Sequence, residues 1–308
     1  MPDLACIGSL VADLVGKPID EYPPRGRLSI VPRMELHTGG CALNSAVAAK
    51  KIGLDAAVIG KVGADGLGEY VMNVLSRQGI NVTNVSQDPS VNTSATMVVV
   101  HGDGERSFMH YIGANAAFTI DDMDWDLVKN TKILHMASAL VMPGIDGEPS
   151  AQILKKAKEL GCTTAMDTTY NPESGWMKML APSFPYVDYF LPSIEEARMI
   201  TGCNSEQDMA SFLLDKGVKV VALKMGENGS YVRSKDVDAY IPIYKVDAVD
   251  GTGAGDAYVA GFLSAIVKGW DLERAGRFAS MVGACSVSAM GATTGILSME
   301  DTLMRFEA

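Results

Sequence analysis

Near its C-terminal end the chain carries the run Asp250-Gly251-Thr252-Gly253-Ala254-Gly255-Asp256, which leads directly into an apolar, Ala-rich segment. Glycines let such a turn point successive backbone N–H groups into one concavity, and a helix that begins there adds its unpaired N–H groups and the positive end of its dipole. Phosphate is the obvious anion for this site. A carboxylate repels phosphate, so Asp256 fits better as a base that takes the proton from an attacking hydroxyl. The alternative is a Gly-rich turn with Asp256 as an ordinary helix N-cap.

A second glycine-led helix is expected near the N-terminus, between His37 and Gly53. Gly39-Gly40 opens an Ala-rich run, and Gly53 is a usual choice for the C-terminal end of a helix. The two glycines would let a ligand approach the backbone, and Asn44, one turn into the helix, offers both a donor and acceptors. Taken alone, the same run is compatible with a plain helix that leaves Asn44 exposed.

Acidic residues follow two of the expected strands. Asp13 comes shortly after an apolar run at 4–9, which predicts a buried first strand. This placement fits a carboxylate that binds polyol hydroxyls at the carboxyl edge of a parallel sheet, and on sequence alone a turn-capping Asp fits equally well. Asp167 and Asn171 come just after a later strand, at the same predicted edge.

Together these motifs resemble the two signatures of the PfkB/ribokinase family of carbohydrate kinases. The family's C-terminal signature, Asp-Thr-x-Gly-Ala-Gly-Asp, matches 250–256 apart from Gly251 at its second position. The N-terminal signature, Gly-Gly-x-x-x-Asn-x-Ala followed by Leu-Gly, matches from Gly39 onward except for Ile52 in place of Leu. It continues as Gly-x-Val-Gly-x-Asp-x-x-Gly from Gly60 to Gly68. The resemblance covers nearly the whole chain.

The resemblance implies roles for residues of both signatures. Asp256 would be the catalytic base, and the anion hole would consist of Gly253, Ala254 and Gly255. The acceptor would be held by Asp13, Gly39, Gly40 and Asn44. The nucleotide, ATP, would lie near Lys224, Gly226, Thr252, Gly253, Gly255 and Ala292.

The resemblance also implies sites for cations. The run 191–197 is similar to the family's Pro-Asn-x-x-Glu-Ala, with Ser193 in place of the asparagine, so Glu196 would act on Mg²⁺ and its waters. The same two residues fit a capping box, and both roles are compatible. The small-residue loop 291–295 would border the nucleotide and a site for a monovalent cation such as K⁺.

Hydrophobic periodicity predicts alternating strands and helices over most of the chain. Strands are expected at 133–138, 163–167, 186–191 and 218–224, and helices at 149–160, 194–201, 256–268 and 272–290. A hairpin at 93–112 and a strand near 30–37 do not fit this pattern and belong to a small side sheet, which the resemblance identifies as a lid. We therefore expect an α/β, ribokinase-like, doubly wound, mostly parallel sheet with helices on both faces and a small β-sheet lid. The core would comprise 1–12, 38–92 and 116–308, and the lid 13–37 and 93–115.

Composition narrows the possible partners and the compartment. The chain has 26 Lys and Arg against 37 Asp and Glu, a net charge of −11, which is not the electrostatic signature of a protein that binds nucleic acid or an anionic membrane. Five scattered cysteines, outside any Cys-x-x-Cys spacing, predict reduced thiols. The sequence shows neither a signal peptide nor a membrane span, so we expect a cytoplasmic protein. A side sheet with apolar residues such as Ile30, Val98 and Met109 predicts a homodimer.

These observations predict a kinase that uses ATP and Mg²⁺ to phosphorylate a hydroxyl of a small, unphosphorylated sugar. A phosphorylated acceptor would need clustered basic side chains, and the candidate segments offer only Lys61 and Arg106, of which Arg106 fits a solvated strand charge better. Two alternatives remain: a nucleoside kinase of the same fold, and a sugar-binding protein without turnover, which the intact Asp256 disfavours. A dinucleotide-dependent dehydrogenase fits poorly, because the first strand is not followed by Gly-x-Gly-x-x-Gly.

Overall fold

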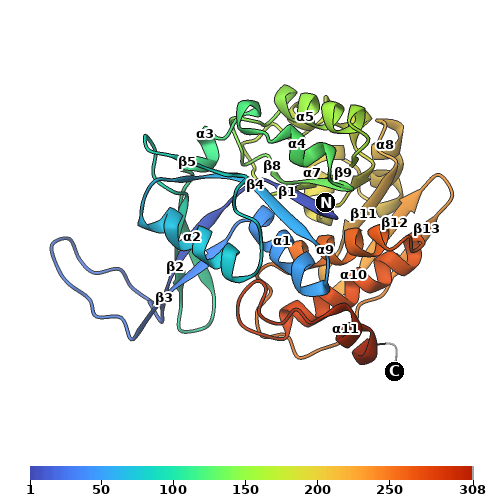
Figure 1. Ribbon diagram of the computed structural model, residues 1–308. Helices are drawn as coiled ribbons and strands as arrows, with labels where there is room; N and C mark the ends of the chain where they lie inside the picture. The colour runs from blue at the N-terminus through green and yellow to red at the C-terminus, as the bar shows by residue number, and fades with distance from the viewer. Residues whose placement is uncertain (307–308) are drawn as a thin grey trace.

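A nine-stranded sheet forms the centre of the protein in the computed structural model, which describes residues 1–306 (Figure 1). The strand order is β13-β12-β11-β10-β9-β8-β1-β4-β5. The neighbouring strands pair in parallel from β11 to β5, whereas β12 and β13 run antiparallel at one edge. The parallel strands are β1 (Leu4–Ile7), β4 (Ala56–Gly63), β5 (Val85–Asp88), β8 (Ile133–Ala139), β9 (Thr163–Thr168), β10 (Tyr189–Phe190) and β11 (Val220–Lys224), and the antiparallel ones are β12 (Ser230–Ser234) and β13 (Asp238–Ile241).

Helices cover both faces of this sheet, as Figure 1 shows. One face carries α1 (Cys41–Ile52), α2 (Gly66–Arg77), α9 (Ala254–Val267), α10 (Leu272–Val287) and α11 (Met299–Phe306). The other carries α4 (Trp125–Lys129), α5 (Glu148–Glu159), α7 (Ile194–Thr201) and α8 (Glu206–Asp215), with the short α3 (Ala114–Ala117) and α6 (Met177–Leu180) in the connections. In β1, Leu4 and Cys6 face the first layer and Ala5 and Ile7 the second, so a strand buried on both sides is apolar throughout.

A separate four-stranded sheet lies beside the core, with strand order β3-β2-β6-β7. Its strands are β2 (Val11–Lys17), β3 (Arg33–Gly39), β6 (Ala95–Val100) and β7 (Arg106–Tyr111). The sequence indicated β3 and the hairpin of β6 and β7 but not β2. Asp13 and Gly16 are poor strand formers and interrupt the apolar pattern of β2. The strand forms because it pairs with β3 on one side and β6 on the other.

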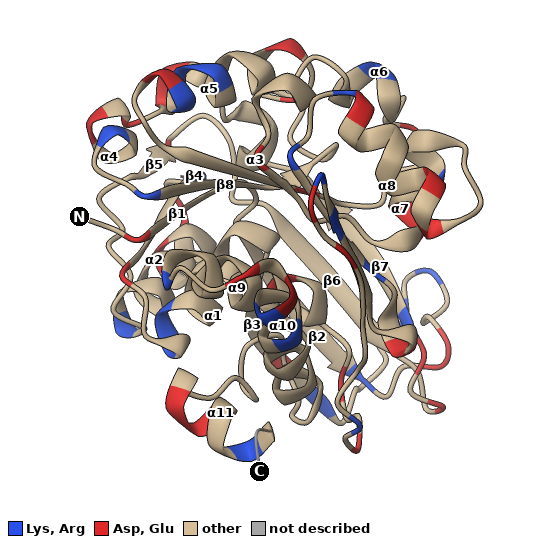
Figure 2. Ribbon diagram, turned by 90° about the vertical axis from the view of Figure 1, so that its right-hand side faces the viewer, with Lys and Arg blue, Asp and Glu red and all other residues tan. Residues whose placement is uncertain are grey.

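The doubly wound fold with a smaller sheet is thus confirmed, and most element bounds lie close to those expected. The main exception is β10, which has two residues instead of the six expected at 186–191, because Phe184–Tyr186 forms a 3-10 turn around Pro185. The last expected helix ends at Val287 instead of 290. Within residues 1–306, none of the helices is long and apolar enough to cross a bilayer. In the view of Figure 2, basic and acidic residues alternate along the ribbons of α4, α5 and α10.

Candidate active site

Asp256 lies in the first turn of α9, and the residue is 9 % exposed. The helix begins at Ala254 with Gly253 as its N-cap, so the alternative in which Asp256 itself is the N-cap is wrong. Asn44 on α1 donates from Nδ2 to Asp256 Oδ2 at 2.8 Å. Burial raises the pKa of Asp256, while this hydrogen bond and the charge of Lys224 lower it. The carboxyl group expected to be a base is therefore held in a mostly dry position at a helix N-terminus.

Close packing and backbone conformation require a glycine at position 253. Gly253 has a left-handed φ of 74°, and a Cβ atom there would lie 2.6 Å from Ala292 Cβ, so the loop after α10 lies directly against the turn. A Cβ atom at Gly255 would lie 3.4 Å from Lys224 Nζ. The Lys224 ammonium group therefore stands beside the first turn of α9, where its charge adds to that of the helix dipole.

Lys224, at the end of β11, is surrounded by carboxylates. Its Nζ lies 2.7 Å from Asp167 Oδ2, and Glu196 and Asp256 are close enough to influence its charge. Burial lowers the pKa of Lys224, but the three carboxylates outweigh it, and the pKa is raised overall. Burial raises the pKa of Asp167 to about 7; the charge of Lys224 lowers this pKa and the charge of Glu196 raises it further. The sequence placed Asp167 at this edge without giving it a role.

Glu196 forms the capping box at the start of α7. Its Oε2 accepts hydrogen bonds from Ser193 N at 2.7 Å and from Thr168 Oγ1 at 3.0 Å, and Ser193 Oγ accepts from Glu196 N. In the described part of the chain, no three His, Cys, Asp or Glu side chains converge closely enough to hold a metal ion by themselves. Gly226 follows β11 in a 3-10 turn with a φ of 56°, and a Cβ atom there would meet no atom within 4 Å.

The expected acceptor residues lie at the junction of the two sheets. Asp13 on β2 is paired with His37 on β3 and Thr96 on β6, and Thr96 is paired with His110 on β7. Directly paired residues point to the same face of a sheet, so these four side chains form one polar row. Burial raises the pKa of Asp13, although Thr96, His110 and His37 all lower it.

At Gly39 and Gly40 the space that a Cβ atom would fill is occupied by neighbouring atoms of Asp13 and Ser9. A Cβ atom at Gly39 would lie 2.2 Å from Asp13 Oδ2, and one at Gly40, where φ is 93°, would lie 2.3 Å from Ser9 O. Asn44 is buried, contrary to the exposed alternative, and its Oδ1 has no hydrogen-bond partner among residues 1–306. A buried amide oxygen without a partner is costly, so Asn44 is suited to accept a hydrogen bond from a ligand hydroxyl.

Arg106 is not the solvated strand charge that the sequence indicated. From the first position of β7 its Nη2 reaches Asp250 Oδ1 at 3.0 Å, and its Nη1 donates to Thr252 Oγ1. Asp250 Oδ1 also accepts from Thr252 N and its Oδ2 from Gly291 N, both at 2.9 Å. Burial raises the pKa of Asp250, but these hydrogen bonds outweigh it and lower the pKa to about 2. The sequence contained no signal for this contact.

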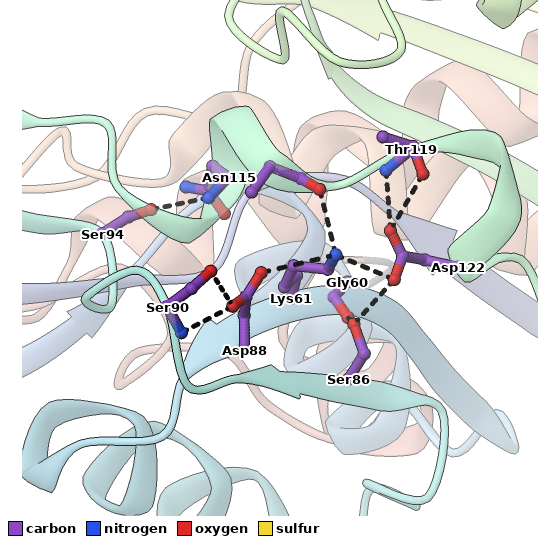
Figure 3. A network of polar contacts seen from close by, with 10 residues as sticks. Gly60, Lys61, Ser86, Asp88, Ser90, Ser94, Asn115, Thr119 and Asp122 are labelled. Atoms are coloured by element: carbon purple, nitrogen blue, oxygen red, sulfur yellow. Dashed lines mark hydrogen bonds and ion pairs between the residues drawn. The ribbon is translucent and has the colours of Figure 1, made fainter.

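Lys61, the other basic residue of the candidate segments, is also occupied (Figure 3). Its Nζ lies 2.9 Å from Asp122 Oδ1 and 3.9 Å from Asp88 Oδ2, and it donates to Ala117 O at 3.0 Å. These contacts tie β4 to β5 and to the turn at Ile120–Asp122. Asp65 of the same signature is likewise structural: it accepts from Gly68 N at the start of α2 and from Thr93.

The model of the pfkB family of carbohydrate kinases matches residues 1–299. The chain belongs to this family. Among curated relatives, the deoxyribokinase of Salmonella typhi is 27 % identical, with 97 % of this chain and 96 % of that one covered. The 5-dehydro-2-deoxygluconokinase of Clostridium perfringens is 28 % identical over 97 % of this chain and 90 % of its own.

Solved structures of ribokinases share the fold. The ribokinase of Thermotoga maritima superposes with a TM-score of 0.86 at 25 % identity, over 100 % of both chains. The ribokinase of Arabidopsis thaliana, solved in complex with ribose and ATP, gives a TM-score of 0.86 at 24 % identity over 98 % of both chains. The resemblance that the motifs indicated is thereby confirmed over the whole pfkB domain, and the protein is a carbohydrate kinase.

Proposed function

We propose that this kinase transfers the γ-phosphoryl group of ATP to a hydroxyl of a small, unphosphorylated sugar, with Asp256 as the base. The observation that carries the proposal is the hydrogen bond between Asn44 and Asp256. Asn44 is suited to hold the acceptor, and Asp256 lies at the N-terminus of α9, whose backbone N–H groups are suited to hold phosphate. The hydrogen bond brings these two parts of the site together. A hydroxyl bound by Asn44 would lie beside the group that takes its proton, which is the geometry that general-base catalysis needs.

The turn before α9 would hold the charge that develops on the transferred group. Gly253, Ala254 and Gly255 would supply backbone N–H groups, and the Lys224 ammonium beside Gly255 would add a positive charge. Thr252, Gly226 and Ala292 complete the proposed nucleotide site. Burial of Asp256 supports the assignment as well, because a raised pKa makes a carboxylate a better proton acceptor.

The acids around Lys224 fit a bound Mg²⁺. Asp167, Glu196 and Asp256 together carry more negative charge than one lysine offsets. Burial is the main reason that the pKa of Asp167 is raised, and the charges of Glu196 and Asp256 add to it. Glu196 would hold the ion through its water shell, the usual arrangement for Mg²⁺ beside phosphates. When bound, the ion would offset negative charge on the phosphates. We also keep a monovalent cation such as K⁺ at the loop 291–295 as part of the proposal, testable by comparing turnover in K⁺ and in choline salts.

The acceptor site favours hydroxyls over a phosphate. Asp13, Thr96 and Asn44 offer hydrogen-bonding groups, whereas Arg106 and Lys61 are both engaged by carboxylates elsewhere. A phosphate dianion would also be repelled by Asp13. The test is a turnover screen over ribose, fructose, deoxyribose, nucleosides and the phosphates of fructose. We expect a free sugar to be the best acceptor; a clear preference for a phosphorylated sugar would overturn this assignment, and preference for a nucleoside would favour the alternative.

We further propose that the smaller sheet is the lid over the acceptor site and that its outer face pairs with a second copy of the chain. One row of side chains across its four strands is apolar and points to the face opposite to that of Asp13; it consists of Leu36, Leu14, Met97 and Met109. Met97 and Met109 are each 47 % exposed. Val98, which we expected on this face, is buried. A two-fold contact would bury the row.

Sedimentation of the wild-type chain and of Met109→Glu tests the dimer. We expect a dimer for the wild type at micromolar concentration and a monomer for the variant. A wild type that sediments only as a monomer would refute this proposal. A cytoplasmic location remains our expectation for a kinase that uses ATP.

A further inference from the structure

Arg106 links the smaller sheet to the turn that precedes α9. It is the first residue of β7, at the hairpin end of that strand, and its guanidinium group contacts both Asp250 and Thr252. The Arg106 side chain is 31 % exposed and that of Asp250 only 5 %. A planar guanidinium that donates two hydrogen bonds fixes direction as well as distance.

Asp250 is the point where three segments meet. Its carboxylate accepts from Arg106 of the smaller sheet, from Thr252 N of the turn and from Gly291 N of the loop after α10. The pKa of Asp250 is about 2, so the carboxylate remains charged throughout the neutral range and the contact with Arg106 remains an ion pair.

The turn at 251–255 depends on these hydrogen bonds for a fixed conformation, because its own small side chains make few contacts. Gly251 stands where the family signature has threonine, and a Cβ atom there would meet no atom within 4 Å. Glycine is the most flexible residue in the chain, and the run 251–255 contains three of them. N–H groups stabilise a transition state only when they are already aligned with the developing charge.

The same strand also reaches the acceptor residues. His110 lies four positions after Arg106 on β7, about 13 Å along an extended strand, and is paired with Thr96 in the row of Asp13. One hairpin therefore contacts the phosphate-binding turn near its tip and carries polar side chains of the acceptor row near its base.

We propose that Arg106 is a positioning residue that couples the placement of the smaller sheet over the acceptor to the alignment of the phosphate-binding turn. The inference rests on the proposed function. Arg106 acts through Asp250 and Thr252 and needs no contact with either substrate.

The test compares Arg106→Met with Arg33→Met in steady-state kinetics. Arg33 is a matched control, since it lies on the same sheet and its side chain is 63 % exposed. Among residues 1–306 its side chain pairs only with Glu35 of its own strand. Losing a charged hydrogen-bond pair should lower the kcat of Arg106→Met by about tenfold to one hundredfold. Its KM for ATP should stay within about threefold of the wild type, because the lost interaction acts mainly in the transition state. Arg33→Met should match the wild type.

Two further variants separate positioning from a merely structural role. Arg106→Lys should recover part of the lost kcat, because a single ammonium can keep the charge but not both contacts. Thr252→Ala should cost much less in the Arg106→Met background than in the wild type, as expected for two residues in one interaction. Melting temperatures measured in parallel would show whether a variant has lost folded protein instead of alignment.

Equal kcat values for Arg106→Met and Arg33→Met, or losses that simply multiply in the double variant, would overturn the inference. So would a loss explained wholly by a lowered melting temperature. Failure of the proposed function has a different signature, namely a wild-type protein that phosphorylates none of the sugars tested.

Discussion

Asn44 and Asp256 are 212 positions apart in the sequence, yet Asn44 Nδ2 and Asp256 Oδ2 are joined by a hydrogen bond of 2.8 Å. Each residue comes from one of the two family signatures, and each lies in the first turn of an Ala-rich helix. The bond requires α1 and α9 to pack closely side by side, which their small residues permit. The two motifs are therefore parts of one site.

Replacing Asn44 should change both acceptor binding and the pH profile. Asn44→Ala removes the bond that lowers the pKa of Asp256, so this pKa should rise. A base must be deprotonated to act, and the acidic limb of the kcat/KM profile should therefore move to higher pH. A profile that keeps its acidic limb in place would contradict the role given to this bond. Ser45→Ala, which removes a neighbouring buried hydroxyl without a described partner, should leave activity and the profile unchanged.

Gly39→Ala should weaken sugar binding specifically. The added Cβ would lie 2.2 Å from Asp13 Oδ2, so the carboxylate must move out of its row. We expect the KM for the sugar to rise by about tenfold or more, the cost of a misplaced hydrogen bond to a charged group, with the KM for ATP unchanged. Gly66→Ala is the matched control, because a Cβ there meets no atom within 4 Å. An equal rise in both KM values would contradict the assignment of Asp13.

Asp65→Ala should lower stability by about 1 to 2 kcal/mol at neutral pH, the usual cost of removing a helix N-cap. Hydrogen bonds from Thr93 and Gly68 outweigh burial and lower the pKa of Asp65 to about 2, from 3.8 in an unfolded chain. A carboxyl group with a lowered folded-state pKa stabilises the fold above pH 3.8, and this contribution disappears as the pH falls through about 2. Denaturant unfolding of both proteins should thus converge between pH 4 and pH 2, and a constant difference would refute the linkage.

Much of the fold was readable from the sequence because its signals are local. Gly39-Gly40 and the run 250–256 mark helix starts by composition, and Ser193 with Glu196 marks the start of α7 as a capping box, which the structure contains. Strand β2 was missed because Asp13 and Gly16 are poor strand formers, and pairing with β3 and β6 decides their conformation. The short β10 reflects the 3-10 turn around Pro185.

The site was less predictable than the fold because its contacts join distant segments. The sequence singled out Asp13, Asn44, Lys224 and Asp256, and the structure brings Asn44 and Lys224 to Asp256. It gave no sign that Asp167 pairs with Lys224 or that Arg106 reaches Asp250. The first pair depends on the order of β9, β10 and β11 in the central sheet, and the second on where the hairpin of β6 and β7 lies relative to α9. No local sequence pattern encodes either arrangement.

The most direct test of the whole account is the turnover of Asp256→Asn on the best sugar found in the screen, measured together with its affinity for ATP. Asparagine preserves the shape of the side chain but cannot take a proton, so kcat should fall by about 10² to 10⁴-fold, while the affinity for ATP changes little. Turnover close to that of the wild type would show that Asp256 is not the base.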